Sequence, residues 1–133
     1  MNKLDKKSII GISALLVHAA KIDENYSEHE KDLVKQFINS YQKDEDSNEV
    51  LNKAEKIESD SNQLLNFTNI IKQSSLEIKK DIIQHLWRVL ISDGTVDQYE
   101  SNLMRRICGL IYFSDKECAE IKLQLLNSKW LIL

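Results

Sequence analysis

Apolar residues recur along this chain every three or four positions, the spacing that places them on one face of an α-helix. The chain contains no Pro and only three Gly, the two residues that interrupt helices most strongly. All-β folds need frequent turn residues, so we expect an all-α fold, a compact bundle of about seven helices. The pattern predicts helices at approximately 6–22, 27–42, 47–59, 61–72, 75–92, 97–110 and 114–128.

Four of the predicted helices begin with the sequence of a capping box, in which Ser or Asp stands three residues before Glu. The N-cap side chain of such a box accepts a hydrogen bond from the backbone N–H of the third helical residue. The side chain of that third residue accepts one from the N-cap N–H in return. The four pairs are Ser27 with Glu30, Ser74 with Glu77, Asp97 with Glu100, and Ser114 with Glu117. We expect the first residue of each pair to be an N-cap.

The most apolar predicted helix is 75–92, in which apolar residues occupy more than half of the circumference. A helix that is apolar this far round is buried by several neighbours, so we expect it to be the central helix.

The C-terminal segment KWLIL, residues 129–133, is also apolar. We expect it to pack into the core; docking onto a partner, or onto a second copy in a homodimer, is the alternative.

An internal repeat relates the two halves of the chain, at about 10–40 and 80–110, by an offset of 70 residues. Identical residues at this offset are Leu16 and Leu86, Asp23 and Asp93, Glu30 and Glu100, and Leu33 and Leu103. The repeat predicts two helix–turn–helix hairpins, each with an acid in its turn and a second acid in its second helix. Such hairpins can pack about an approximate two-fold axis, which would set the acidic turns in corresponding places.

The length of 133 residues suits one domain, spanning 1–133, and the net charge of −3 does not favour a nucleic-acid partner. Residues 23–60 hold 12 Asp or Glu against 5 Lys, so we expect one acidic face.

No apolar run reaches the ~18–20 residues of a membrane-spanning helix. The lysine-rich start is expected to form a first helix rather than a signal peptide. Cys108 and Cys118 lack CxxC spacing, so we expect core thiols in a cytoplasmic protein.

The acids of the two predicted turns are candidate metal ligands: Asp23, Glu30, Asp93 and Glu100. Ca²⁺ and Mg²⁺ prefer oxygen ligands, and four converging carboxylates would supply them. Neither turn is an EF-hand loop, because the position that requires Gly holds Glu28 or Gln98. The alternative is that these acids only cap and terminate helices. No nucleophile with an adjacent base and no Gly-rich phosphate loop is present, so we expect no enzymatic activity.

Two stretches resemble the tellurite-resistance TerB family: AKIDENYSEHE, and LWRVLISDGTVDQYESNLMRRICGLIYFSDKE. The family pattern is a helix, Asp-Gly, a short hydrophobic step, and Glu seven residues after the Asp, occurring twice. The second copy matches at Asp93, Gly94 and Glu100, whereas the first has Glu24 in place of Gly. The resemblance covers nearly the whole chain and extends to the N-terminal region of some membrane-linked DnaJ-type co-chaperones.

The resemblance implies a single all-α bacterial domain with clustered acids, linked to tellurite and other stress responses. It also implies protein partners, including complexes near the bacterial inner membrane. We therefore expect a non-enzymatic binding module whose acidic turns form one site for Ca²⁺, Mg²⁺ or a basic surface. The alternative is a purely structural protein–protein interaction domain in which the acids are helix caps.

Overall fold

The computed structural model describes residues 4–22, 26–43, 46–60, 65–91 and 98–132. Within these ranges the chain forms seven α-helices and no strand, which confirms the all-α prediction. The helices are α1 (Lys6–Ala20), α2 (Glu28–Tyr41), α3 (Ser47–Asp60), α4 (Leu65–Lys72), α5 (Leu76–Ile91), α6 (Gln98–Ile111) and α7 (Asp115–Ile132). None of the helices in the described ranges is long and apolar enough to cross a membrane.

The helix ends lie close to their predicted positions, with one clear difference at the C-terminus. The helix predicted to end at residue 128 continues to Ile132, so the backbone of most of the apolar KWLIL segment is helical. The side chains of residues 128–133 lie outside the described part of the structure. The prediction that this segment packs into the core therefore stays a prediction.

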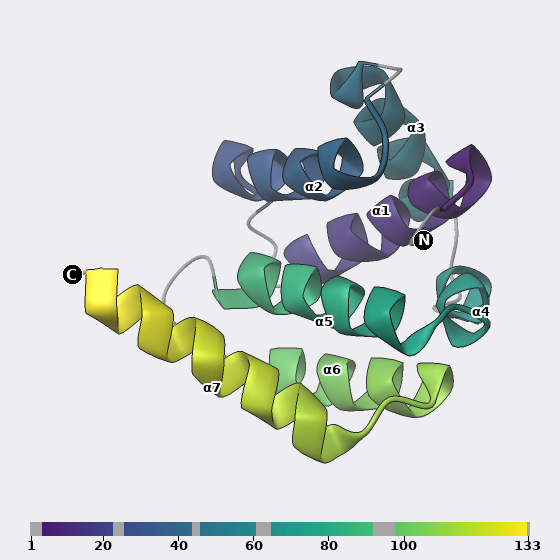
Figure 1. Ribbon diagram of the computed structural model, residues 1–133. Coiled ribbons are helices and arrows are strands. Elements are labelled where there is room, and N and C mark those ends of the chain that lie inside the picture. The colour runs from purple at the N-terminus through teal and green to yellow at the C-terminus, as the bar shows by residue number, and fades with distance from the viewer. Residues whose placement is uncertain (1–3, 23–25, 44–45, 61–64, 92–97, 133) are drawn as a thin grey trace.

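Two helices share the centre of the bundle, α1 and α5, whereas the sequence predicted only the second. Figure 1 shows them side by side, with α2 and α3 on one side and α6 and α7 on the other. Helix α1 packs against α2, α3, α4 and α5, and α5 packs against α1, α2, α4 and α7. Small residues allow neighbours to approach α1 closely: a Cβ at Gly11 would lie 2.7 Å from Cδ1 of Ile70. Two-thirds of the residues of α1, from Ile9 to Ala20, are buried by these neighbours, so α1 is as central as α5.

The predicted caps are confirmed at two of the four helices. The hydroxyl of Ser27 accepts from the N–H of Glu30, and that of Ser114 accepts from the N–H of Glu117. The prediction for α5 is wrong, because the N-cap bond is made by Ser75, which accepts from Ile78 at 3.3 Å. Ser74 instead closes α4, since its hydroxyl donates to the Ile70 carbonyl. Two adjacent serines compete for this position, and the pattern alone selected the wrong one. The fourth predicted cap, Asp97, lies outside the described residues.

Cys108 and Cys118 are both buried, free thiols in the hydrophobic core, as predicted. They join α6 to α7, and the adjacent Trp87 indole N–H of α5 donates to the backbone carbonyl of Cys118 at 3.1 Å. The hydrogen bond with Cys118 and burial raise the pKa of the Cys108 thiol. Cys108 therefore remains protonated and serves as a packing residue.

Candidate functional site

Glu30 and Glu100 occupy equivalent places in their own helices, as the repeat predicted. Each is the third residue of its helix, α2 or α6, and their exposed fractions are 5% and 4%. They are the only carboxylates buried in the part of the chain that the structure describes. Carboxylates are seldom this buried unless they are paired or hydrogen-bonded. The offset of 70 therefore reflects a repeated structural environment as well as a repeated sequence.

The surroundings of Glu30 form a complete capping box. Its Oε1 accepts from the Ser27 N–H at 2.9 Å and from the Ser27 hydroxyl at 3.2 Å. The Glu30 N–H donates in return to the Ser27 hydroxyl oxygen at 3.2 Å. These bonds offset the desolvation of one carboxylate oxygen and fix the start of α2 beside the first acidic turn. The capping role predicted for Glu30 is therefore confirmed.

The two buried glutamates belong to the same end of the bundle but to helices on different sides of it. In Figure 1, α1 and α5 end where α2 and α6 begin, and α2 and α6 lie on opposite sides of the α1–α5 pair. The other two predicted ligands, Asp23 and Asp93, lie outside the described residues. Within the described ranges, no group of three or more His, Cys, Asp or Glu is arranged to hold a metal ion.

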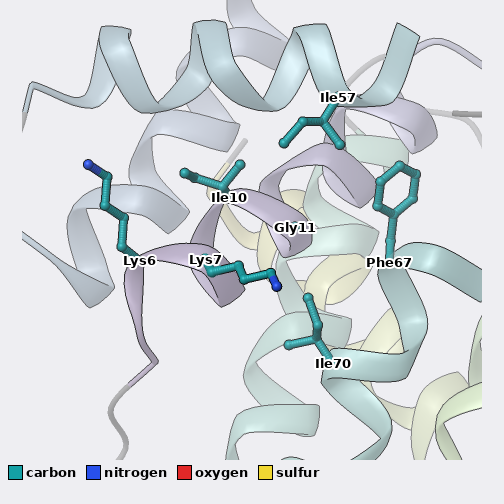
Figure 2. Close-up of a pocket in the computed structure, with 7 residues that line it drawn as sticks. All are labelled: Lys6, Lys7, Ile10, Gly11, Ile57, Phe67 and Ile70. Atoms are coloured by element: carbon teal, nitrogen blue, oxygen red, sulfur yellow. The ribbon is translucent and has the colours of Figure 1, made fainter. Parts of the chain in front are cut away.

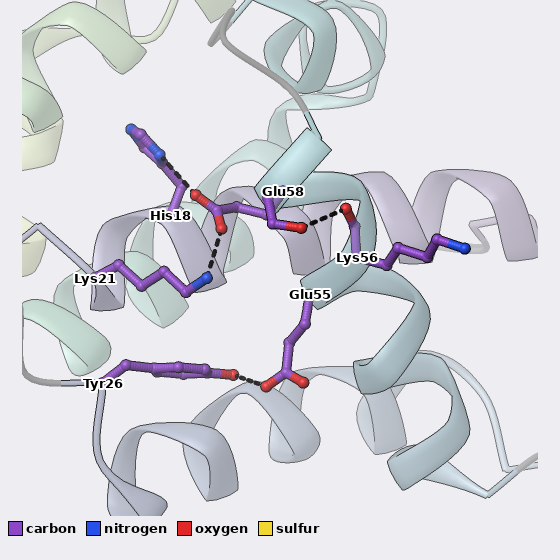
Figure 3. A network of polar contacts seen from close by, with 7 residues as sticks. His18, Lys21, Tyr26, Glu55, Lys56 and Glu58 are labelled. Atoms are coloured by element: carbon purple, nitrogen blue, oxygen red, sulfur yellow. Dashed lines mark hydrogen bonds and ion pairs between the residues drawn. The ribbon is translucent and has the colours of Figure 1, made fainter.

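A polar network that the sequence did not predict holds both sides of the first acidic turn against α3 (Figure 3). Before the turn, Lys21 Nζ pairs with Glu58 Oε1 at 2.8 Å, and His18 Nδ1 lies 3.3 Å from Glu58 Oε2. After the turn, the Tyr26 hydroxyl donates to Glu55 Oε2 at 2.7 Å. Helix α3 therefore fixes the residues that flank positions 23–25. The spacing of Glu55 and Glu58, which puts them on one helix face, was the only signal in the sequence.

A second contact of a half-buried tyrosine links α2 to α5. The Tyr41 hydroxyl donates to Asp81 Oδ2 at 2.7 Å, and His85 Nε2 lies 3.6 Å from the same oxygen. Burial, together with the carboxylate partners Asp81 and Glu55, raises the pKa of both Tyr41 and Tyr26 well above the ordinary value. Burial lowers the pKa of His85, so this histidine is neutral at physiological pH.

The raised pKa values of the two tyrosines predict that the protein loses stability in alkali. Because their folded-state pKa values exceed the unfolded value of about 10, their contribution is complete below about pH 10 and falls as the pH rises further. The ionisation of each phenol lowers the free energy of unfolding by less than about 1.4 kcal/mol per pH unit, since both side chains are half-buried and screened by solvent. Urea unfolding from about pH 8 to about pH 11.5 should show the decline, and the Tyr26→Phe/Tyr41→Phe variant should show a flatter one. An equally steep decline in that variant would contradict the assignment.

Comparison with protein families gives a match over most of the chain. Searches of the curated proteins and of the solved structures found none. The family model described as "Tellurite resistance protein TerB" matches residues 10–123, which include both halves of the repeat. The match starts within α1 and ends within α7, so it spans all the helices that bury the core. The chain therefore belongs to the TerB family, which is related to tellurite resistance.

Proposed function

We propose that this protein is a non-enzymatic cytoplasmic binding module of the tellurite and stress response, whose acidic turns together bind a divalent cation, Ca²⁺ or Mg²⁺. The ligands would be Asp23, Glu30, Asp93 and Glu100. A hard cation accepts carboxylate oxygens and neutralises charges that repel one another. The module would present this site to protein partners, including those of an inner-membrane complex.

The observation that carries the proposal is the equivalent burial of Glu30 and Glu100. The glutamate at this position of a capped helix does not need to be buried, as Glu117 shows: it is the third residue of α7, donates its N–H to Ser114, and remains partly exposed. Burial of a carboxylate has a free-energy cost, and that cost recurs at both copies of the repeat. A cation between the turns would add to hydrogen bonds such as that of Ser27 to Glu30, which already offset part of this cost. The network around Lys21 and Tyr26 supports the proposal by fixing the approach to the first turn.

The complete capping box of Ser27 and Glu30 favours a second candidate function. In it the protein is a structural interaction domain, the acids are caps, and a partner docks elsewhere. Removing a cap costs about 0.5–2 kcal/mol, regardless of which cations are present. The two candidates therefore differ in whether the effect of a substitution depends on the cation.

The test is the thermal unfolding midpoint after chelation, and again with Ca²⁺, Mg²⁺, Mn²⁺ or Zn²⁺ added singly at constant ionic strength. At about one hundred times its dissociation constant a cation should add about 2.7 kcal/mol, which is a shift of several degrees. The shift should disappear in the Asp93→Asn and Glu100→Gln variants.

The matched control is Glu117→Gln, which also changes the third residue of a helix whose N-cap is a serine. This variant should lose some stability and keep the full response to the cation. Equal midpoints with and without every cation would refute the cation site and leave the interaction domain as the function.

A further inference from the structure

An apolar pocket of about 510 Å³ opens between α1, α3 and α4 (Figure 2). Its walls are formed by Ile10 and Gly11 of α1, Ile57 of α3, and Phe67 and Ile70 of α4. It adjoins the first half of α1, whereas the first acidic turn follows the end of that helix. The pocket is therefore separate from the proposed cation site.

The walls of the pocket leave apolar surface facing solvent. The side chain of Ile57 is 42% exposed, and Ile10 and Ile70 are only partly buried. Figure 2 shows these three side chains and Phe67 around one space, contributed by three helices. An occupant with an apolar body would remove this surface from water.

Gly11 brings the backbone of α1 close to Ile70 of α4 in the wall of the pocket. A Cβ at this position would lie 2.7 Å from Cδ1 of Ile70, so a larger residue would displace Ile70 or occupy the space itself. The pocket therefore depends on the absence of a side chain at this point of α1.

The polar side chains that line the pocket are both cationic. Lys6 and Lys7 stand in the first turn of α1, where the backbone N–H groups also favour negative charge. Figure 2 shows Lys7 extending toward Ile70, with its ammonium group near the apolar walls. The nearby Asp5 carboxylate accepts the Ser8 N–H at 2.7 Å as the N-cap of α1. Lys7 also interacts with the charge of Asp5, so an anionic group at the edge of the pocket would share Lys7 with this carboxylate while its apolar part lies inside.

We propose that this pocket binds a single-chain amphiphile with a carboxylate head, of the fatty-acid class. The acyl chain would lie between Ile10, Ile57 and Ile70, and the carboxylate would pair with Lys7. The size of the pocket is that of a small-molecule site and suits one chain, whereas a membrane lipid carries two. The ligand is therefore a free amphiphile and not a bilayer surface.

The test is isothermal titration of the full chain with sodium dodecanoate below its micelle concentration. Binding should saturate at one molecule per chain. Decanoate should bind more weakly, by about fourfold for each methylene lost from the pocket. Dodecanol and dodecylammonium should bind more weakly than dodecanoate because they lack the anionic head.

Two variants locate the site. Ile57→Gln should weaken dodecanoate binding by about tenfold, since it removes an apolar wall. Lys7→Gln should weaken it by about two- to fivefold and leave dodecanol binding unchanged. Leu123→Gln and Lys53→Gln are the matched controls, because both side chains are exposed and neither lines the pocket. Circular dichroism should show the same helicity in all four variants.

Failure of dodecanoate to saturate, or equal affinity in the Ile57→Gln variant and its control, would overturn the proposal. So would binding to phosphatidylglycerol vesicles without binding to free dodecanoate, since that would assign the surface to a membrane. None of these three results depends on added cations. The proposal for the pocket and the proposal for the cation site can therefore be refuted independently.

Discussion

Replacing Phe37 with alanine is expected to lower the free energy of unfolding by about 3–5 kcal/mol. Phe37 is fully buried and connects α2 to α5. Its ring packs edge-on against His85, with centroids 5.3 Å apart, and lies 5.1 Å from the Tyr41 ring. The substitution removes the packing of a whole aromatic ring and leaves a cavity that the surrounding helices fill only partly.

The expected loss is a large fraction of the roughly 5–15 kcal/mol that stabilises a typical domain. It should lower the unfolding midpoint by about 12–20 °C. The pKa of His85 supplies a second measurement by NMR titration. Burial lowers this pKa, so it should rise toward the ordinary value when water enters the space of the missing ring.

The control for Phe37 is Tyr99→Ala, since Tyr99 is an aromatic residue with 76% of its surface exposed. That variant should change the free energy of unfolding by no more than about 0.5 kcal/mol. A loss below about 1 kcal/mol for Phe37→Ala, or an unchanged His85 pKa, would contradict the described packing between α2 and α5.

Leu16→Ala and Leu86→Ala should each lower the free energy of unfolding by about 2–5 kcal/mol. The two leucines are equivalent in the repeat, one in α1 and the other in α5, and both are fully buried. Because both are fully buried at equivalent positions of the repeat, we expect costs that agree within about 1 kcal/mol, less than the usual spread for buried leucines. Urea unfolding of the two variants measures both values under the same conditions.

Leu123→Ala is the control for these leucines, because Leu123 is 57% exposed on α7. It should change stability by less than about 0.5 kcal/mol. If one core leucine cost several kcal/mol and the other almost nothing, the sequence repeat would not correspond to an equivalent packing environment.

Periodicity predicted the helices well because each one has an apolar face and a clear start. The residues Ser27 and Ser114 mark two of those starts by cap chemistry that depends only on nearby sequence. Ser74 and Ser75 show where local rules fail, because both can cap and the choice depends on how α4 ends. The sequence singled out the helix at 75–92 as central, although α1 is buried to the same degree, because tertiary packing decides which apolar helices share the centre.

Some features of the candidate sites could likewise be predicted from the sequence, and others could not. The repeat predicted the equivalent positions of Glu30 and Glu100, because both follow from the start of a helix. The contacts of Glu55 with Tyr26 and of Asp81 with Tyr41 join residues far apart in the chain. The pocket likewise needs three helices to be in place before it exists. Such features depend on tertiary packing, which no local pattern encodes.

The packing of α1 also has a consequence for the order in which the fold is completed during synthesis. Translation makes α1 before all of its partners, and α2 and α3 follow directly, so these contacts can form early. The surface of α1 that faces α5 has no partner until the chain has grown beyond residue 91. Nascent chains that stall between α4 and α5 therefore leave an apolar face of α1 exposed, which makes them prone to aggregate.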